Sequence, residues 1–345
     1  MRGIVFPGDR TVEVRQLPDP TPGPRDVVVE IRASGMCGTD LKLYHGDADL
    51  RAAGILGTVV GGHEPCGVIV EVGSDVRDEE ARIGQRVMVH HYLGCGVCAS
   101  CRSGWTQMCE RRPVLAYGYT ADGGHADLMV VGATTLVPLP DELSFVAGAA
   151  VSCGTGTAWG ALRRLKITGD ETVAVFGQGP VGLSATLLAS ALGARVIALD
   201  VSASRLERAR DFGAAFTIDP SATDVVSAVR EITRGRGADA SVDASGSPIA
   251  RRQAVQSVRP WGRTAFVGEG GDVVFDVSSD LLRRQVQLHG VWTFSSVEQE
   301  ACATFVAERG IDLDALFTDR WSLEDAGVAY AAFEQQTGGK GVFVH

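Results

Sequence analysis

Long apolar runs are missing from this sequence. No segment reaches the ~18 consecutive apolar residues that a membrane-spanning helix needs. The start, MRGIVFPGDR, contains no run long enough for the apolar core of a secretion signal. We therefore expect a cytoplasmic protein without a membrane partner. In the cytoplasm thiols stay reduced, so clustered cysteines are more often metal ligands or catalytic groups than disulfides.

Positive charge is also scarce. The chain has 32 Lys and Arg residues against 42 Asp and Glu residues, a formal net charge of -10 and a pI near 5.2. Lysine occurs only at Lys42, Lys166 and Lys340, which we interpret as codon bias in a GC-rich genome. Binding to a phosphate backbone needs a clustered basic surface, so this composition argues against nucleic acid as a partner.

Internal repeats and low-complexity linkers are absent as well. With 345 residues, of which 45% are hydrophobic and 21% charged, the chain is long enough for about two domains with substantial cores. The composition predicts an ordinary soluble globular protein.

Half of the eight cysteines fall in one short segment, LGCGVCASCRSGWTQMCE. Cys95, Cys98, Cys101 and Cys109 have the spacing C-x2-C-x2-C-x7-C. Such a loop can place four thiolates around one Zn²⁺ and leave no position open to substrate, which makes the site structural. An iron-sulfur cluster is the main alternative, but the ferredoxin run continues with x3-Cys-Pro, whereas Glu110 follows the last cysteine here. Unligated buried cysteines are the remaining alternative.

Other potential ligands are scattered along the chain. A lone cysteine is usually a small buried hydrophobe, and a lone histidine is usually a satisfied polar group. Spacing alone does not join these residues into one site. They are Cys37, Thr39 and Asp40 in SGMCGTDLK, His63 and Glu64 in GGHEPCG, and Cys153 in VSCGTGTAW.

The segment ETVAVFGQGPVGLSATLLASALGARVIALD predicts a βαβ unit. An apolar strand at 173–176 leads through Gly177, Gly179 and Gly182 into a helix, and a second apolar strand ends at Asp200. The pattern G-x-G-x-x-G in this strand-to-helix context is typical of dinucleotide binding. Its glycines allow a tight turn, a close approach of the pyrophosphate and close packing of helix on strand. The continuous apolar character of the strands indicates a parallel sheet covered on both faces.

Strand-like and helix-like segments alternate after this unit. Further strands are predicted in AAFTID, ADASVDAS, GRTAFVG and QVQLHGV, and a helix is predicted from an N-cap at Ser202 to Gly213. This alternation predicts a doubly wound α/β domain. The first 150 residues instead carry short alternating strands such as DVVVEIRASG and GQRVMVHHY, which predict a β-rich, barrel-like domain. The final GGKGVFVH predicts a strand that returns to that domain.

The chain as a whole resembles the zinc-dependent medium-chain alcohol dehydrogenases. From Gly62 to Val76 it fits the family signature G-H-E-x2-G-x5-G-x2-V, and the CGTD stretch, the cysteine segment and the glycine turn follow in the family's order. The resemblance implies a Rossmann domain, with a doubly wound parallel sheet, inserted into a β-rich, GroES-like catalytic domain. It places the catalytic domain at 1–152 and 291–345 and the NAD-binding domain at 153–290.

The resemblance also assigns roles to the scattered residues. It implies that Cys37, His63 and Cys153 hold a catalytic zinc. Glu64 would lie behind the metal as an alternate ligand, and Asp40 would orient a ligating imidazole by accepting its other N–H.

Three protein ligands leave the fourth position of such a zinc open to substrate. The metal would lower the pKa of a bound alcohol and so favour hydride transfer to nicotinamide. Thr39 would take the alcohol's proton. Lys42 stands where many relatives have a histidine that ends the proton relay. We expect Lys42 to position the cofactor first and to end the relay only secondarily, with a solvated loop lysine as the alternative.

NAD is the expected cofactor. A carboxylate at Asp200 can bind both ribose hydroxyls and repel a 2'-phosphate. Arg205 would pack beside the adenosine, or would instead help a 2'-phosphate to bind. The expected cofactor-binding residues are Gly177, Gly179, Pro180, Val181, Gly182, Asp200 and Arg205.

The expected function is that of a zinc-dependent oxidoreductase that interconverts an alcohol and its aldehyde or ketone, with a secondary alcohol or polyol as the expected substrate. A zinc-free quinone-type reductase would share the glycine turn but should lack Cys37, His63 and the cysteine segment. A noncatalytic zinc-binding scaffold would explain the cysteine segment alone. The resemblance implies one catalytic and one structural zinc per chain.

The partners expected are a small-molecule alcohol or carbonyl substrate and further copies of the chain, as a homotetramer rather than a dimer. Scattered side chains that no motif predicts would shape the pocket. The candidates for its walls are His91, Tyr92, Tyr44, Trp292 and Phe294.

Overall fold

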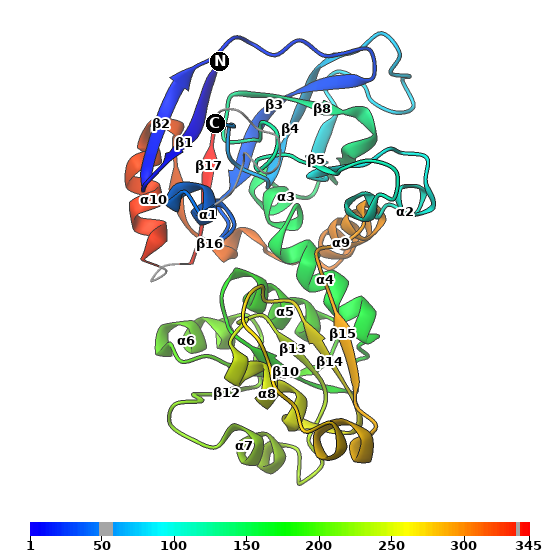
Figure 1. The fold of residues 1–345 in the computed structure, drawn as a ribbon, viewed down its shortest axis with the longest axis vertical. Helices are drawn as coiled ribbons and strands as arrows, with labels where there is room; N and C mark the ends of the chain where they lie inside the picture. The colour runs from blue at the N-terminus through cyan, green and yellow to red at the C-terminus, as the bar shows by residue number, and fades with distance from the viewer. Residues whose placement is uncertain (48–57, 336–338) are drawn as a thin grey trace. The chain divides into compact units, whose positions relative to one another are not determined.

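The computed structural model describes residues 1–47, 58–335 and 339–345, and all that follows refers to these residues. They divide into two compact units (Figure 1). The outer unit consists of Met1–Cys153 and Ser295–His345, and the inserted unit consists of Gly154–Phe294. This confirms the predicted fold class, in which an α/β domain interrupts a β-rich domain built from both ends of the chain.

The inserted unit is a parallel sheet flanked by helices. Its elements are α4 (Gly154–Leu165), β10 (Thr172–Phe176), α5 (Pro180–Ala191), β11 (Arg195–Leu199), α6 (Ala203–Asp211), β12 (Phe216–Ile218), α7 (Val225–Ile232), β13 (Ala238–Asp243), α8 (Pro248–Ser257), β14 (Val258–Phe266), η3 (Val277–Leu281), η4 (Leu282–Arg284) and β15 (Gln287–Gly290). The strand order is β12-β11-β10-β13-β14-β15, and every neighbouring pair is parallel.

This strand order reverses between β10 and β13. Crossovers between parallel strands are right-handed. Helices α5 and α6, which lead from β10 to β11 and β12, therefore cover one face of the sheet, and helices α7 and α8, which lead to β13 and β14, cover the other. The apolar strand residues explain the double cover, since Val173, Ala174 and Val175 are all fully buried. Ligands of such sheets bind at the carboxyl ends of the strands where the order reverses. The predicted glycine turn follows β10 at that point.

Local capping fixes the helices of the inserted unit. The Ser202 hydroxyl accepts the N–H of Arg205 at the start of α6, as predicted, and Gly213 after its end has φ +93°. Pro180 occupies the first turn of α5, where a missing N–H costs nothing. β14 begins at Val258, earlier than predicted, and Trp261 within it has φ +63°.

The outer unit is built on an antiparallel sheet with one parallel edge pair. Its strands are β1 (Arg2–Gly8), β2 (Thr11–Gln16), β3 (Asp26–Gly35), β4 (Pro65–Val72), β5 (Arg86–Val89), β6 (Tyr92–Leu93), β7 (Leu115–Ala116), β8 (Leu128–Gly132), β9 (Leu136–Pro138), β16 (Phe317–Trp321) and β17 (Lys340–Val344). Its helices and helical turns are α1 (Asp40–His45), α2 (Ala99–Arg102), η1 (Thr106–Met108), η2 (Ala133–Thr135), α3 (Phe145–Val151), α9 (Ser296–Glu308), η5 (Asp314–Leu316), η6 (Leu323–Asp325) and α10 (Ala326–Glu334).

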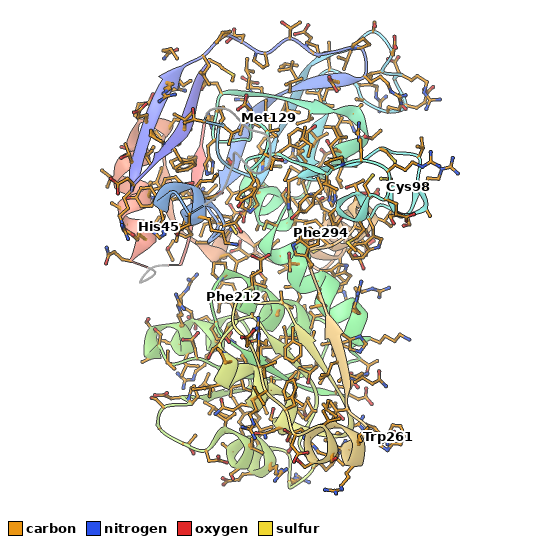
Figure 2. All side chains as sticks on the ribbon, in the orientation of Figure 1. His45, Cys98, Met129, Phe212, Trp261 and Phe294 are labelled. Carbon is orange, nitrogen blue, oxygen red and sulfur yellow. The ribbon has the colours of Figure 1, made fainter. Side chains whose placement is uncertain are left out.

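The main sheet of the outer unit runs β16-β17-β3-β4-β5-β9, with β8 also paired to β3. Strand β17 is the predicted returning strand. It pairs antiparallel with β3, so that Val342 lies opposite Gly35. One face of β3 packs on a core that contains Ile31, Val87 and Met129 (Figure 2). The pairing brings the C-terminal strand β17 alongside the end of β3, two residues before Cys37.

No single helix in the described residues is both long and apolar enough to cross a membrane. Only α3 and α4, taken together as a bent pair, reach the necessary length and composition.

Candidate metal centres and cofactor site

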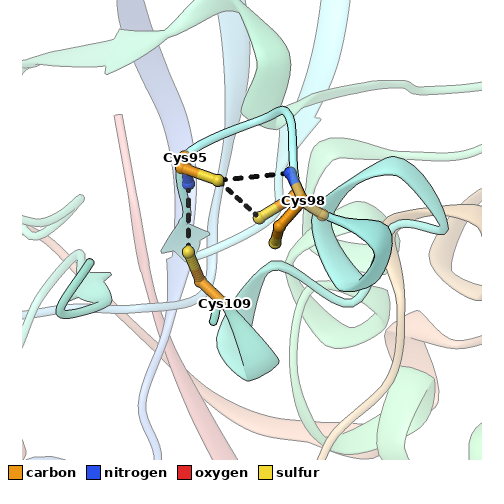
Figure 3. Close-up of side chains that lie close together, drawn as sticks. Cys95, Cys98 and Cys109 are labelled. Carbon is orange, nitrogen blue, oxygen red and sulfur yellow. Dashed lines mark hydrogen bonds between the residues drawn. The ribbon is translucent and has the colours of Figure 1, made fainter. Parts of the chain in front are cut away.

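Residues 95–109, which we call the cysteine lobe, bring four thiols together. The sulfur atoms of Cys95, Cys98, Cys101 and Cys109 all lie within 4.8 Å of one another. The N–H of Cys98 donates to the Cys95 sulfur and the N–H of Cys95 donates to the Cys109 sulfur, each at 3.4 Å (Figure 3). The Cys95 and Cys101 sulfurs are 3.9 Å apart. The lobe is thus a compact cage of sulfur atoms held by its own backbone.

The donor set of the lobe fits a tetrahedral zinc. Zn–S bonds of about 2.3 Å place two thiolates of a tetrahedron roughly 3.8 Å apart, close to the observed separation. Backbone N–H groups of Arg111 and Cys95 lower the pKa of Cys109 to about 6, which favours the thiolate that a metal requires. The residue before Cys95 must be small, because a Cβ at Gly94 would lie 2.5 Å from the Cys101 sulfur.

A second group of ligands comes from segments far apart in the sequence. Cys37 follows β3, His63 and Glu64 precede β4, and Cys153 lies between α3 and α4. One ligand atom from each of the four lies within 4.8 Å of the others, and we call this group the dispersed cluster. The two sulfurs are 4.0 Å apart and the Cys153 sulfur is 3.5 Å from His63 Nε2. The structure therefore assembles the residues that spacing alone could not join.

The dispersed cluster also fits zinc. In a tetrahedral site with two thiolates and an imidazole, sulfur and nitrogen lie roughly 3.6 Å apart and the sulfurs roughly 3.8 Å apart. The surroundings favour a cation. Burial disfavours a charge on His63, but the acidic groups of Asp40 and Cys37 outweigh burial and raise the pKa of the imidazole well above its usual value. A divalent metal ion would satisfy that same excess of negative donors.

Asp40 fixes the orientation of His63. Its carboxylate is fully buried, and Oδ1 lies 3.1 Å from His63 Nδ1. The other oxygen accepts the backbone N–H of Cys37 at 2.8 Å. With Nδ1–H directed at a carboxylate, Nε2 is the nitrogen that can ligate a metal.

Lys340 is a residue of this region that sequence reasoning missed. Its ammonium group is buried and lies 2.7 and 2.6 Å from the two carboxylate oxygens of Glu64, and it also donates to the Met36 carbonyl at 2.9 Å. Burial disfavours the ammonium, but Glu64 and Cys37 outweigh it and raise the pKa of Lys340. A Cβ at Gly35 would lie 2.0 Å from a Glu64 oxygen, so glycine there makes room for the pair. The scarcity of lysine was a signal, but it drew attention to Lys42.

The structure places the other predicted site residues on or beside α1. Thr39 is half-buried directly before α1, two residues after Cys37. Lys42 is exposed in the last turn of that helix.

The proposed pocket walls divide into two groups. His91 lies beside the dispersed cluster, with its ring centre 5.2 Å from that of His63 and its Nδ1 donating to the Ser152 carbonyl at 3.1 Å. Tyr92 follows it, and its ring lies tilted at 47° to the His91 ring with centres 4.2 Å apart. Tyr44 packs in a hydrophobic core of the outer unit, and Phe294, which Figure 2 labels, is fully buried, so we assign both to packing. Trp292 is 49% exposed in the inserted unit.

The glycine turn has the geometry its pattern predicts. Gly177 has φ +85°, a conformation that side chains disfavour, and a Cβ at Gly182 would lie 1.7 Å from the Gly177 carbonyl oxygen. A Cβ at Gly179 would meet no atom within 4 Å, so space for a ligand lies open beside the start of α5. Val181 and Pro180 continue into that first turn. Backbone N–H groups at a helix start bind phosphate.

Asp200 lies directly after β11 beside this turn. One carboxylate oxygen accepts the N–H of Gln178 at 2.6 Å, and the other accepts the N–H of Ser202 at 2.9 Å. Arg205 lies 3.9 Å from the carboxylate. The carboxylate is thus fixed at the edge of the turn, where a ribose bound next to the pyrophosphate would meet it.

Comparisons with known proteins match both units. The family described as "Alcohol dehydrogenase GroES-like domain" matches residues 23–141, and the family described as "Zinc-binding dehydrogenase" matches residues 180–308. The chain is 38% identical to the "Uncharacterized zinc-type alcohol dehydrogenase-like protein YphC" of Escherichia coli strain K12, over 99% of this chain and 97% of that protein. It is 29% identical to the sorbitol dehydrogenase of Bacillus subtilis strain 168, over 94% of this chain and 91% of that protein.

Solved structures give the same picture. The alcohol dehydrogenase TADH from Thermus sp. ATN1 superimposes with a TM-score of 0.91 at 29% identity, over 100% of this chain and 99% of that chain. The similarity extends over both units and includes the segments that carry the two groups of candidate metal ligands.

Proposed function

The chain belongs to the zinc-dependent alcohol dehydrogenases, and from this premise we propose that it oxidises a secondary alcohol or a polyol with NAD. Membership in the family makes it an enzyme that interconverts alcohols and carbonyl compounds with zinc. The substrate class, the choice of cofactor, the zinc stoichiometry and the roles of single residues are the proposal.

The dispersed cluster is the observation that carries the proposal. Cys37, His63 and Cys153 supply three ligands of the kinds that a catalytic zinc uses, and a fourth position stays open when Glu64 remains bound to Lys340. A zinc-free reductase of the same fold would have no use for two half-buried thiols beside a buried imidazole. A scaffold with the cysteine lobe alone would need neither this cluster nor the glycine turn.

A zinc ion held there would supply Lewis acidity toward an alcohol or carbonyl oxygen. The protein residues do the rest. Asp40 keeps His63 Nδ1 protonated and leaves Nε2 for the metal. The Thr39 hydroxyl would accept the alcohol's proton and release its own proton to a relay that leads to solvent. Lys340 holds Glu64, so this carboxylate would be free to ligate a bound metal only if the ion pair opened.

The proposed cofactor is NAD, and Asp200 supports it. A fixed carboxylate beside the glycine turn can accept both ribose hydroxyls, whereas it repels a 2'-phosphate. Steady-state kinetics with both cofactors test this choice. We expect a higher kcat/KM with NAD, and a higher value with NADP would make Arg205, rather than Asp200, the residue that decides.

A secondary alcohol or polyol is the proposed substrate. The support is the similarity over nearly the whole chain to a sorbitol dehydrogenase. An NAD-coupled screen should compare matched pairs, such as 2-butanol against 1-butanol and sorbitol against glucose. Higher kcat/KM for the secondary alcohol and the polyol is the expected result. A preference for the primary alcohol would contradict the substrate class but leave the zinc chemistry standing.

We also propose one catalytic and one structural zinc per chain, a homotetramer, and a cytoplasmic location. Two separate ligand groups support the stoichiometry. The edge strand β15, which exposes Leu288, supports an association between copies. Eight free cysteines support a reducing compartment. Light scattering of the zinc-loaded protein measures the oligomeric state directly.

A further inference from the structure

A chain of buried polar side chains continues beyond Asp40. His125 Nε2 lies 3.8 Å from the Asp40 carboxylate and 2.8 Å from the Tyr330 hydroxyl. The other ring nitrogen of His125 is 2.8 Å from the Ser34 hydroxyl. All four residues are fully buried. They come from β3, the segment before β8, α1 and α10, so the arrangement exists only in the folded unit.

Buried polar groups of this kind need partners. A fully buried carboxylate is costly unless several donors bind it, and Asp40 must in addition keep one oxygen for His63. Its other oxygen accepts the Cys37 N–H at 2.8 Å and lies 3.8 Å from His125 Nε2. The Ser34 and Tyr330 hydroxyls hold the two nitrogens of His125, which prevents rotation of the ring away from Asp40.

The backbone around His125 is fixed to the segment that carries His63. The N–H of His125 donates to the Gly61 carbonyl at 2.9 Å, and the N–H of Gly124 donates to the Gly62 carbonyl at 2.7 Å. A Cβ at Gly62 would lie 2.4 Å from His125 Nδ1, and Gly62 has φ +88°. The glycine that precedes His63 in the sequence thus makes room for His125.

Tyr330 is in turn fixed by aromatic packing. Its ring meets Phe6 edge-on with centres 4.9 Å apart, and His125 meets Phe343 at 4.8 Å. The hydroxyl therefore has a defined position relative to His125.

We propose that His125 and Tyr330 are positioning residues of the catalytic zinc. They hold the Asp40 carboxylate against His63, and so hold His63 Nε2 where the metal binds. The proposal rests on the proposed function, because it requires zinc in the dispersed cluster. It extends the support of the metal two residues beyond Asp40.

The test is the rate at which zinc is lost to a chelator. Wild-type protein loaded with zinc should release it in two phases, and the phase missing from His63→Ala identifies the catalytic metal. Removing an outer partner of a metal ligand typically weakens binding by about 10- to 100-fold. We expect Tyr330→Phe, which removes only the hydroxyl, to speed that phase roughly tenfold and to leave the phase of the cysteine lobe unchanged.

Tyr117→Phe is the matched control. Its hydroxyl is also buried and accepts the Gly132 N–H at 2.9 Å, but it belongs to another core. It should lower the melting temperature about as much as Tyr330→Phe and leave both zinc phases unchanged.

If Tyr330→Phe does not fold, His125→Gln replaces it as the test variant. Its rate of zinc release from the dispersed cluster should then lie between the rates of wild type and His125→Leu.

A double-mutant cycle with Asp40→Asn separates positioning from general stability. If Tyr330 acts through Asp40, adding Tyr330→Phe to Asp40→Asn should not speed zinc release further. An equal acceleration in both backgrounds, or wild-type release from Tyr330→Phe, would overturn the inference. A wild-type chain that binds one zinc, in the cysteine lobe alone, would instead overturn the proposed function.

Discussion

The two groups of candidate metal ligands in the outer unit are built in opposite ways. The cysteine lobe takes four ligands from residues 95–109, and backbone N–H groups hold their sulfurs. The dispersed cluster takes its ligands from segments up to 116 residues apart, and charged side chains such as Asp40 and Lys340 hold them. A local closed site can order its own loop, whereas a dispersed open site forms only once the whole unit has folded. The first is suited to stability and the second to chemistry.

The sharpest way to test this difference is to remove one ligand of the dispersed cluster. His63→Ala should lower kcat by about 10³-fold or more, because Lewis-acid stabilisation is worth several kcal/mol and each 1.4 kcal/mol is tenfold. The melting temperature should change by only a few degrees. Activity assays and thermal unfolding of the same preparation check both. A variant that retains a tenth of wild-type activity would place the chemistry elsewhere.

Cys98→Ala tests the other side of the comparison. A closed zinc site contributes folding free energy outright, so losing one ligand should leave the lobe unfolded and the protein poorly soluble or incompletely assembled. Limited proteolysis should cut first between 95 and 109. Gel filtration and zinc content report the rest. Soluble, stable and correctly assembled protein without activity would reverse the roles assigned to the two sites.

Lys340→Met should destabilise the dispersed cluster without touching a ligand. The substitution leaves the Glu64 carboxylate buried without its 2.6 Å partner, which typically costs about 3–5 kcal/mol. Urea unfolding measures the loss, and adding Glu64→Gln should recover most of it. Arg112→Met removes an exposed cation beside the lobe and should cost less than about 1 kcal/mol. If Lys340→Met and Arg112→Met lowered the free energy of unfolding by the same amount, side-chain charge would hold both sites alike.

Lys42 should give the smallest effect, because the structure places it on the surface of α1. Lys42→Ala should raise the KM for NAD by about threefold and lower kcat less, through loss of a cation that attracts the cofactor. Lys42→His should keep activity and move the pH optimum downward, toward an imidazole pKa of ~6.5. Unchanged NAD kinetics and an unchanged pH profile in both variants would make Lys42 an ordinary solvated lysine.

Much of the fold could be predicted because its signals are local. The periodicity and caps of α6, the apolar run of β10 and the glycine turn each depend on a few neighbouring residues. The spacing of the cysteine lobe is equally local. A single sequence is enough to predict these features, because the backbone conformation that each one needs is set within one or two turns of the chain.

The rest of the site has no local signal. Lys340 meets Glu64 across 276 residues, and Tyr330 meets His125 across 205. Such pairs depend on the register of β17 against β3 and on the packing of α10, which no spacing in the sequence reveals. The resemblance to a family supplied Cys37, His63, Cys153 and the supporting Asp40, but it did not lead to Lys340, His125 or Tyr330.

Zinc content of purified protein and its His63→Ala variant tests the central claim most directly. If the chain has one structural and one catalytic metal site, atomic absorption should give about two zincs per wild-type chain. His63→Ala should retain about one zinc, with nearly wild-type thermal stability and no measurable turnover. One zinc in the wild type, or loss of both zincs from His63→Ala, would contradict the division of labour between the two sites.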